Sequence, residues 1–212
     1  MDHSATHFSG RRRHERGART RAKLIKAALH QFSRKGYDGV SVREIEIGAG
    51  VKRNLVQHHF GNKQALWKAV VDRAFGQWRE YVDIREELVR DLDANMRIYY
   101  VVRSYVRFNA LHPEFHQLIT RESSQDGWRL RYLVEEHVRG HVDELRILLE
   151  QELDLEPGDF FHIYYLLAAG GAMPFTMAPE VDMLFGIDVN NDEIIDRHAR
   201  ILVELLVNKR LK

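Results

Sequence analysis

The fold is decided by residues 41–66, which read SVREIEIGAGVKRNLVQHHFGNKQAL. Ser41, followed three residues later by Glu44, is a capping-box pattern that predicts the start of a helix. Gly50 interrupts this helix, and a second short helix is expected over roughly residues 52–58. Two short helices around a glycine, preceded by a supporting helix, predict a helix-turn-helix.

The segment before this stretch predicts the supporting helix, which is expected to begin near Thr20. Its apolar residues recur at helical spacing and define one face: Leu24, Ala27, Ala28, Leu29 and Phe32. Gly36 is placed to end it. Residues 1–16 lack this periodicity and are expected to be a flexible basic arm. The domain organisation that follows is an arm over 1–16, a helix-turn-helix domain over 17–65 and a helical domain over 66–212.

The second short helix offers side chains that donate hydrogen bonds, and none of its expected exposed residues is acidic. These residues are Lys52, Arg53, Asn54, Gln57 and His58. In a helix-turn-helix the second helix lies in the major groove, where such side chains reach bases and phosphates. The alternative is a small helical subdomain with a solvated basic face.

Charge is divided unevenly along the chain. Residues 1–63 hold 14 Lys/Arg and 5 Asp/Glu, a net charge of +9, whereas residues 64–212 carry −8. This asymmetry favours a polyanion-binding module attached to an acidic domain. A disordered basic tail without a partner is the alternative for the run of three arginines that starts at Arg11.

Residues 20–70 resemble the N-terminal domain of TetR/AcrR-type transcriptional regulators. The resemblance rests on SVREI at 41–45, AGV at 49–51 and HHFGNKQAL at 58–66, with Phe32 and Gly36 before them. It implies an all-α homodimer with an N-terminal three-helix helix-turn-helix domain and a C-terminal helical domain that binds ligand and dimerises. The implied partners are double-stranded operator DNA and a small-molecule effector, and the implied activity is ligand-responsive transcriptional regulation, with repression favoured.

Three positions depart from the pattern of that family: Lys52 replaces the usual Ser or Thr, Asn54 a small residue and Gln57 a tyrosine. The operator sequence is therefore not expected to be shared with relatives. The resemblance also aligns Ser41, His58 and Lys63 with positions that often contact phosphates. The expected DNA-binding residues are Ser41, Arg43, Lys52, Arg53, Asn54, Gln57, His58 and Lys63.

The acidic region is also expected to be helical, with helices over about 96–111, from Pro113 onward, over 130–153 and over 160–173. A loop with a turn or two is expected near 178–191, and a last helix over 194–206. The helix over 160–173 has few polar residues, so most of its sides must be covered. With the last helix it is expected to form the dimer interface, through Ile194, His198, Ile201, Leu202 and Leu205. An intrachain core is the alternative for both helices.

Large or polar residues inside these apolar helices are candidates for an effector site, because ligand pockets are mostly apolar with a few placed polar groups. They are Tyr105, Phe108, Asn109, Trp128, Tyr132 and Tyr164. Aromatic residues at helical spacing also form plain core, which is the alternative for each of them.

Several function classes are disfavoured by composition. The chain has no cysteine, so disulfides and thiolate sites are excluded. No apolar run approaches ~18 residues, so no membrane span or secretory signal is expected and the default location is cytoplasmic. Neither cofactor nor catalytic residue is expected. The alternative function is a metal-dependent helical protein or enzyme that uses His137 and His141, which are four residues apart on one helix face.

Overall fold

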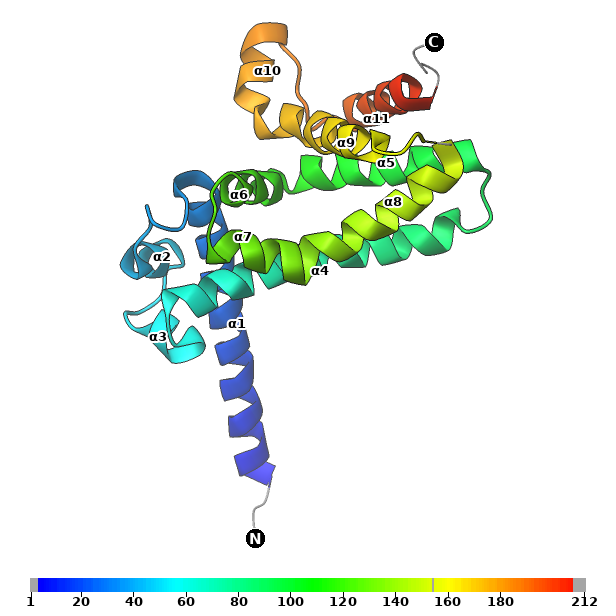
Figure 1. Cartoon of the computed structure of the whole chain (residues 1–212). Coiled ribbons are helices and arrows are strands. Elements are labelled where there is room, and N and C mark those ends of the chain that lie inside the picture. Colours follow the sequence, from blue (N-terminus) through cyan, green and yellow to red (C-terminus); the bar gives the residue numbers. More distant parts are fainter. Residues whose placement is uncertain (1–3, 154, 208–212) are drawn as a thin grey trace. The chain divides into compact units, whose positions relative to one another are not determined.

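The computed structural model describes residues 4–153 and 155–207, and side chains between residues 15 and 205. This part of the chain contains helices and no strands (Figure 1). The elements are α1 (Ser4–Lys35), α2 (Val42–Gly48), α3 (Leu55–Phe60), α4 (Lys63–Val89), α5 (Ala94–Leu111), α6 (Pro113–Ser123), α7 (Trp128–Leu133), the π-helical turn η1 (Val134–Val138), α8 (Arg139–Leu153), α9 (Asp159–Thr176), α10 (Ala178–Phe185) and α11 (Asp192–Val207).

The chain divides into two compact units, Met1–Ala74 and Phe75–Lys212, and the boundary falls within α4. The all-α architecture expected from the sequence is confirmed. Within residues 4–153 and 155–207, no helix is both long and apolar enough to span a membrane.

In the N-terminal unit, α1 buries the predicted face. Leu24, Ala28 and Phe32 are fully buried. Gly36 ends α1 with a positive φ of 75°, and its N–H donates to the carbonyl of Phe32. The sequence missed Trp67 of α4, which is also fully buried.

Helix α1 begins at Ser4, earlier than the start expected near Thr20, so the structure does not show residues 4–16 as a non-helical arm. The segment contains no proline, and its backbone continues the helix across Gly17 without a break. Thr20 Oγ1 donates to the carbonyl of Arg16, a contact typical of a helix interior. Apolar periodicity therefore marks where α1 begins to bury side chains, and not where its helix begins. Residues 1–3 lie outside the described residues.

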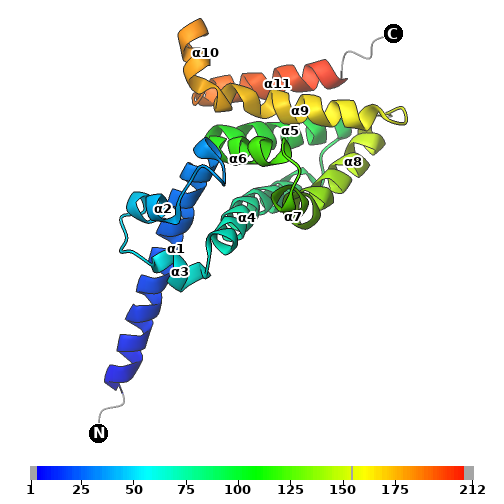
Figure 2. The ribbon, with the colours of Figure 1, turned by 60° about the vertical axis from the view of Figure 1, so that its left-hand side comes forward.

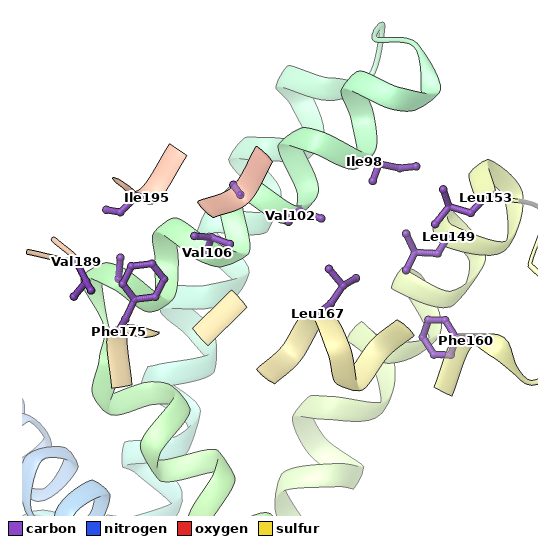
Figure 3. Packing of buried hydrophobic residues seen from close by; sticks show 12 residues of the cluster. Ile98, Val102, Val106, Leu149, Leu153, Phe160, Leu167, Phe175, Val189 and Ile195 are labelled. Atoms are coloured by element: carbon purple, nitrogen blue, oxygen red, sulfur yellow. The ribbon is translucent and has the colours of Figure 1, made fainter. Parts of the chain in front are cut away.

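The core of the C-terminal unit lies between α5, α8, α9 and α11. Figure 3 shows Ile98, Val102 and Val106 of α5 facing Leu149, Leu167 and Ile195 from the other helices. Three arginines of α5 reinforce this packing with ion pairs to two other helices: Arg97 with Glu152 of α8, and Arg103 and Arg107 with Asp196 and Asp192 of α11.

The structure refines two expectations for this unit. The region near 178–191, expected to be a loop with a turn or two, contains the eight-residue helix α10. Pro179 in its first turn and Gly186 at its C-cap, with a φ of 63°, supply the start and stop signals. The single helix expected over 130–153 is interrupted by η1. A π-turn inserts one residue into a helix and rotates the following residues.

Gly170 and Gly171 permit close approach of neighbouring helices within the chain. A Cβ at Gly171 would lie 2.7 Å from Cδ1 of Tyr105, and a Cβ at Gly170 would lie 3.0 Å from Cδ2 of Leu202. Tyr105 has little room to move, because its hydroxyl donates to the carbonyl of Ala168 and its ring packs edge-on against Trp78.

Replacing Gly171 by alanine should therefore lower the free energy of unfolding by ~1–3 kcal/mol, the usual cost of overpacking. Gly140 of α8 is a matched control, because a Cβ there meets no atom within 4 Å. Gly140→Ala should instead stabilise by ~0.5–1 kcal/mol, the helix preference of alanine over glycine. Urea unfolding of both variants measures the difference, and equal effects would contradict the packing described.

Candidate nucleic-acid interface

Helix α2 begins with the capping box that the sequence predicted. The hydroxyl of Ser41 accepts from the N–H of Glu44, and the Glu44 carboxylate accepts from the N–H of Ser41 at 2.7 Å. Lys35 adds an ion pair to Glu44 at 3.2 Å. The backbone N–H of Ser41, its hydroxyl and Lys35 together lower the pKa of Glu44 from 4.5 to about 2.

Ser41→Ala should destabilise the N-terminal unit by ~0.5–2 kcal/mol, the usual cost of losing an N-cap. The free energy of unfolding should also fall less steeply in the variant as the pH is lowered into the acid range. Because the pKa of Glu44 is lower in the folded chain, its contribution is present above pH 4.5 and is lost as the pH falls from 4.5 towards 2. Thermal unfolding between pH 2 and 7 tests this. An unchanged pH dependence in the acid range would contradict the role of the cap.

Helix α3 is held to α2 by a carboxylate that the sequence reading missed. Glu46 is 4% exposed, and its Oε1 accepts from the N–H of Val56 at 2.9 Å. This N–H belongs to the first turn of α3, which has no intrahelical acceptor for it. Glu46 therefore fixes the start of α3 against α2. Its partner lies ten residues further along the chain, so no local sequence pattern predicts this hydrogen bond.

Helix α3 begins later than expected, at Leu55, because Asn54 has a left-handed backbone with φ 64°, and it ends later, at Phe60. Lys52 and Arg53 consequently lie in the turn before α3, and not within the expected helix over 52–58. Lys52, Arg53, Asn54, Gln57 and His58 are all exposed. The Asn54 side chain makes no capping hydrogen bond.

A contact with α1 holds the other end of α3. The guanidinium of Arg21 lies 5.0 Å from the centre of the Phe60 ring. Burial, with nearby His58 and Arg21, lowers the pKa of His59, which favours its neutral form. Asn62 caps the start of α4 by accepting from the N–H of Ala65 at 2.8 Å.

The N-terminal unit thus exposes most of the expected DNA-binding residues, and they lie on α2, the turn before α3, and α3 itself. Ser41 and Arg43 are exposed on α2, and Lys63 is half-buried, with its Nζ 4.3 Å from the centre of the Tyr37 ring. These side chains are almost all hydrogen-bond donors, and cations are prominent among them. Such a surface can bind phosphates and the acceptor edges of bases.

In the C-terminal unit, three of the expected effector residues lie together on α5. Phe108 packs edge-on against Trp78 and Phe115 at 5.0 and 5.1 Å. Asn109 is fully buried; its amide donates to the carbonyl of Tyr105, whereas its Oδ1 has no partner among the described residues. Burial raises the pKa of Tyr105 well above its usual range.

The other three effector candidates are more dispersed. Tyr132 packs edge-on against His137 at 5.7 Å, the ring of Tyr164 is tilted against that of Phe160 at 6.0 Å, and Trp128 is half-exposed beside Arg129. The sequence reading missed the aromatic residues that α4 contributes to this region, Phe75, Trp78 and Tyr81.

The histidine pair behind the metal alternative packs against an aromatic ring. His137 stacks on Phe75 at 4.7 Å, and His141 lies nearly parallel to the same ring at 6.5 Å. Burial and the charge of Arg79 lower the pKa of His141. Within 4–153 and 155–207, no group of three or more His, Cys, Asp or Glu residues is placed to hold a metal ion. The metal-dependent alternative is not favoured.

The expected dimer residues of α11 divide into two groups. Ile201 and Leu205 are 44% and 52% exposed. Leu202 instead packs towards Gly170, and His198 Nε2 hydrogen-bonds with the carbonyl of Gly170 at 2.7 Å, while Ile194 is half-buried. Helix α9 adds further exposed apolar side chains: Phe161, Tyr165, Leu166 and Met173.

Comparison with known proteins finds a family match within the N-terminal unit. Residues 24–70 match the family model described as bacterial regulatory proteins, tetR family. Among curated relatives, the transcriptional repressor NicS of Pseudomonas putida is 26% identical over 126 residues, 56% of this chain and 55% of that protein. The match therefore spans about half the length of NicS.

Other similarities extend over nearly the whole chain. The regulator RutR of Escherichia coli K12 is 23% identical over 96% of this chain and 98% of its own. The crystal structure of FadR from Bacillus subtilis in complex with stearoyl-CoA has a TM-score of 0.64 and 19% identity, and covers 88% of this chain and 97% of that one. The structural likeness confirms the fold, and these relatives are named as regulators.

Proposed function

Because residues 24–70 belong to the tetR family of bacterial regulatory proteins, we propose that this chain is a DNA-binding transcriptional regulator that represses its targets and is released from DNA by a small molecule. The observation that carries the proposal is the donor-rich surface of the N-terminal unit. Arg53 and Asn54 are exposed immediately before α3, whose start Glu46 fixes. A regulator of this kind acts where the DNA is, in the bacterial cytoplasm.

Arg53→Ala and Asn54→Ala test whether this surface reads bases. Each should weaken operator binding by ~1–3 kcal/mol, the usual contribution of a bidentate hydrogen bond to a base, and relax the sequence preference. Lys63→Ala should instead weaken binding to all sequences alike, as expected for a residue that binds phosphate. Arg139→Ala, at an exposed position on α8, is the matched control. Gel shifts with the chain's own upstream duplex and a scrambled duplex measure both effects, and binding insensitive to Arg53 and Asn54 would contradict base reading.

The proposed regulator acts as a homodimer. The exposed apolar residues of α9 and α11 support this, because large apolar side chains grouped on a surface are typical of interaction sites. A two-fold dimer presents two copies of α3, so the operator should be roughly palindromic, with half-sites about one helical turn (~34–36 Å) or a multiple of it apart.

The effector is proposed to bind among the helices between residues 96 and 175 of the C-terminal unit. Its support is the aromatic group around Phe108 and the unpartnered, buried Oδ1 of Asn109, which together suit an apolar or aromatic molecule with a hydrogen-bond donor. The related fold of FadR was solved with stearoyl-CoA, whose stearoyl chain is apolar and whose coenzyme A part is polar.

Release requires that the effector bind better to the form of the dimer that does not fit the operator. Helix α4 runs through both units and is the proposed lever. Linkage then demands that operator DNA weaken effector binding by the same factor, typically ~5–150-fold. Titrating a bound effector with and without operator DNA tests this reciprocity, and equal affinities in the two titrations would contradict the lever.

A further inference from the structure

Helix α1 carries a row of cations on the side opposite its buried face. Arg16, Arg19, Lys23 and Lys26 are exposed and follow one another at steps of three, four and three residues. This spacing places them on one face of the helix. The buried residues Leu24, Ala28 and Phe32 lie on the other side.

Helix α1 also extends past α3 at its N-terminal end. Gly17 of α1 lies beside His59: a Cβ placed on Gly17 would be 4.0 Å from Cε1 of His59. Arg21, one turn further along α1, contacts Phe60. Residues 4–16 therefore continue beyond the level of α3, as Figures 1 and 2 both show. At 1.5 Å per residue these 13 residues reach ~20 Å, which exceeds the ~12 Å width of a major groove.

The extension is basic in sequence as well as long. Residues 4–16 hold four arginines and one glutamate. Like charges three or four residues apart destabilise a helix slightly, so the row from Arg16 to Lys26 is not explained by helix stability. A polyanion that neutralises it would explain it. Since the extension starts beside α3, the nearest polyanion is the duplex that α3 binds.

We infer that the N-terminal extension of α1 is a second DNA-binding element, which contacts phosphates beyond the base pairs that α3 reaches. The inference rests on the proposed function, because it requires α3 to lie on DNA. Phosphate contacts add affinity and carry no direct sequence information. The extension should therefore lengthen the protected site and strengthen binding without changing sequence preference.

The experiment compares full-length chains. One variant is Arg16→Gln/Arg19→Gln, a second is Arg11→Gln/Arg12→Gln/Arg13→Gln, and Arg131→Gln/Arg139→Gln, at exposed positions of the C-terminal unit, is the charge-matched control. Binding to the upstream duplex and to a scrambled duplex is measured from 50 to 300 mM salt, together with a hydroxyl-radical footprint.

Both extension variants should bind both duplexes about 3–30-fold more weakly, with an unchanged preference between them. The slope of log affinity against log salt should become shallower by about 0.9 for each phosphate that the variant no longer neutralises, and the footprint should shorten at its outer edges. An unchanged slope and footprint, or an altered preference, would overturn the inference while the wild-type chain still binds its operator. If the wild-type chain prefers neither duplex, the proposed function fails as well.

Discussion

Leu205→Asp should convert the dimer into monomers that bind the operator weakly. Leu205 is 52% exposed in one chain, on the same side of α11 as Ile201, and the proposed interface would bury it. Burying an unpaired carboxylate costs several kcal/mol. We therefore expect the dimer dissociation constant to rise at least about 100-fold, since each factor of ten corresponds to ~1.4 kcal/mol.

Sedimentation velocity at micromolar concentration checks this result, because a dimer has twice the 24.9 kDa mass of one chain. Leu88→Asp is the matched control, since Leu88 of α4 is 73% exposed and belongs to neither α9 nor α11. The control should remain dimeric. If Leu205→Asp sediments as the wild type does, α11 is not part of the dimer interface.

Glu46→Ala should abolish tight operator binding, although Glu46 is buried and is not among the residues proposed to contact DNA. The variant leaves the N–H of Val56 without its acceptor and releases the start of α3 from α2. Hydrogen bonds to charged groups contribute about 1.5–3 kcal/mol, so a comparable loss in unfolding free energy is expected. Arg53 and Asn54 precede this turn directly, and their positions should become poorly defined.

Glu46→Gln keeps both the length of the side chain and a hydrogen-bond acceptor, because its amide oxygen can still accept from the N–H of Val56. It should retain more stability and more operator affinity than Glu46→Ala. Thermal unfolding and gel shifts on the same preparations measure the two properties. Equal behaviour of Glu46→Ala and the wild type would show that α3 is held by apolar packing alone.

Local signals allowed most of the N-terminal unit to be predicted. Ser41 and Asn62 each cap a helix through a hydrogen bond with the residue three positions further along the chain. The local sequence is therefore enough to place the starts of α2 and α4. Gly36 likewise ended α1 where expected. The expected DNA-binding positions came from the expected second short helix and from the family resemblance, and the use of these residues on DNA stays a prediction.

Features that depend on distant contacts could not be predicted. The partner of Glu46 lies ten residues away in sequence, and the left-handed backbone of Asn54, which delays the start of α3, has no signal in the pattern of apolar residues. On α11 one apolar stripe suggested a single interface, yet Leu202 packs towards Gly170 while Leu205 is exposed. Helical spacing identifies a face, but the neighbouring helix decides which part of that face it covers.

Footprinting of the wild-type chain on its own upstream DNA shows whether the chain binds as a regulator with two copies of α3. We predict two protected half-sites related by two-fold symmetry, with centres ~34–36 Å or a multiple of it apart, and protection that disappears in Leu205→Asp. Protection without symmetry, or none that exceeds that of a scrambled duplex, would show that the chain does not bind an operator as a two-fold dimer.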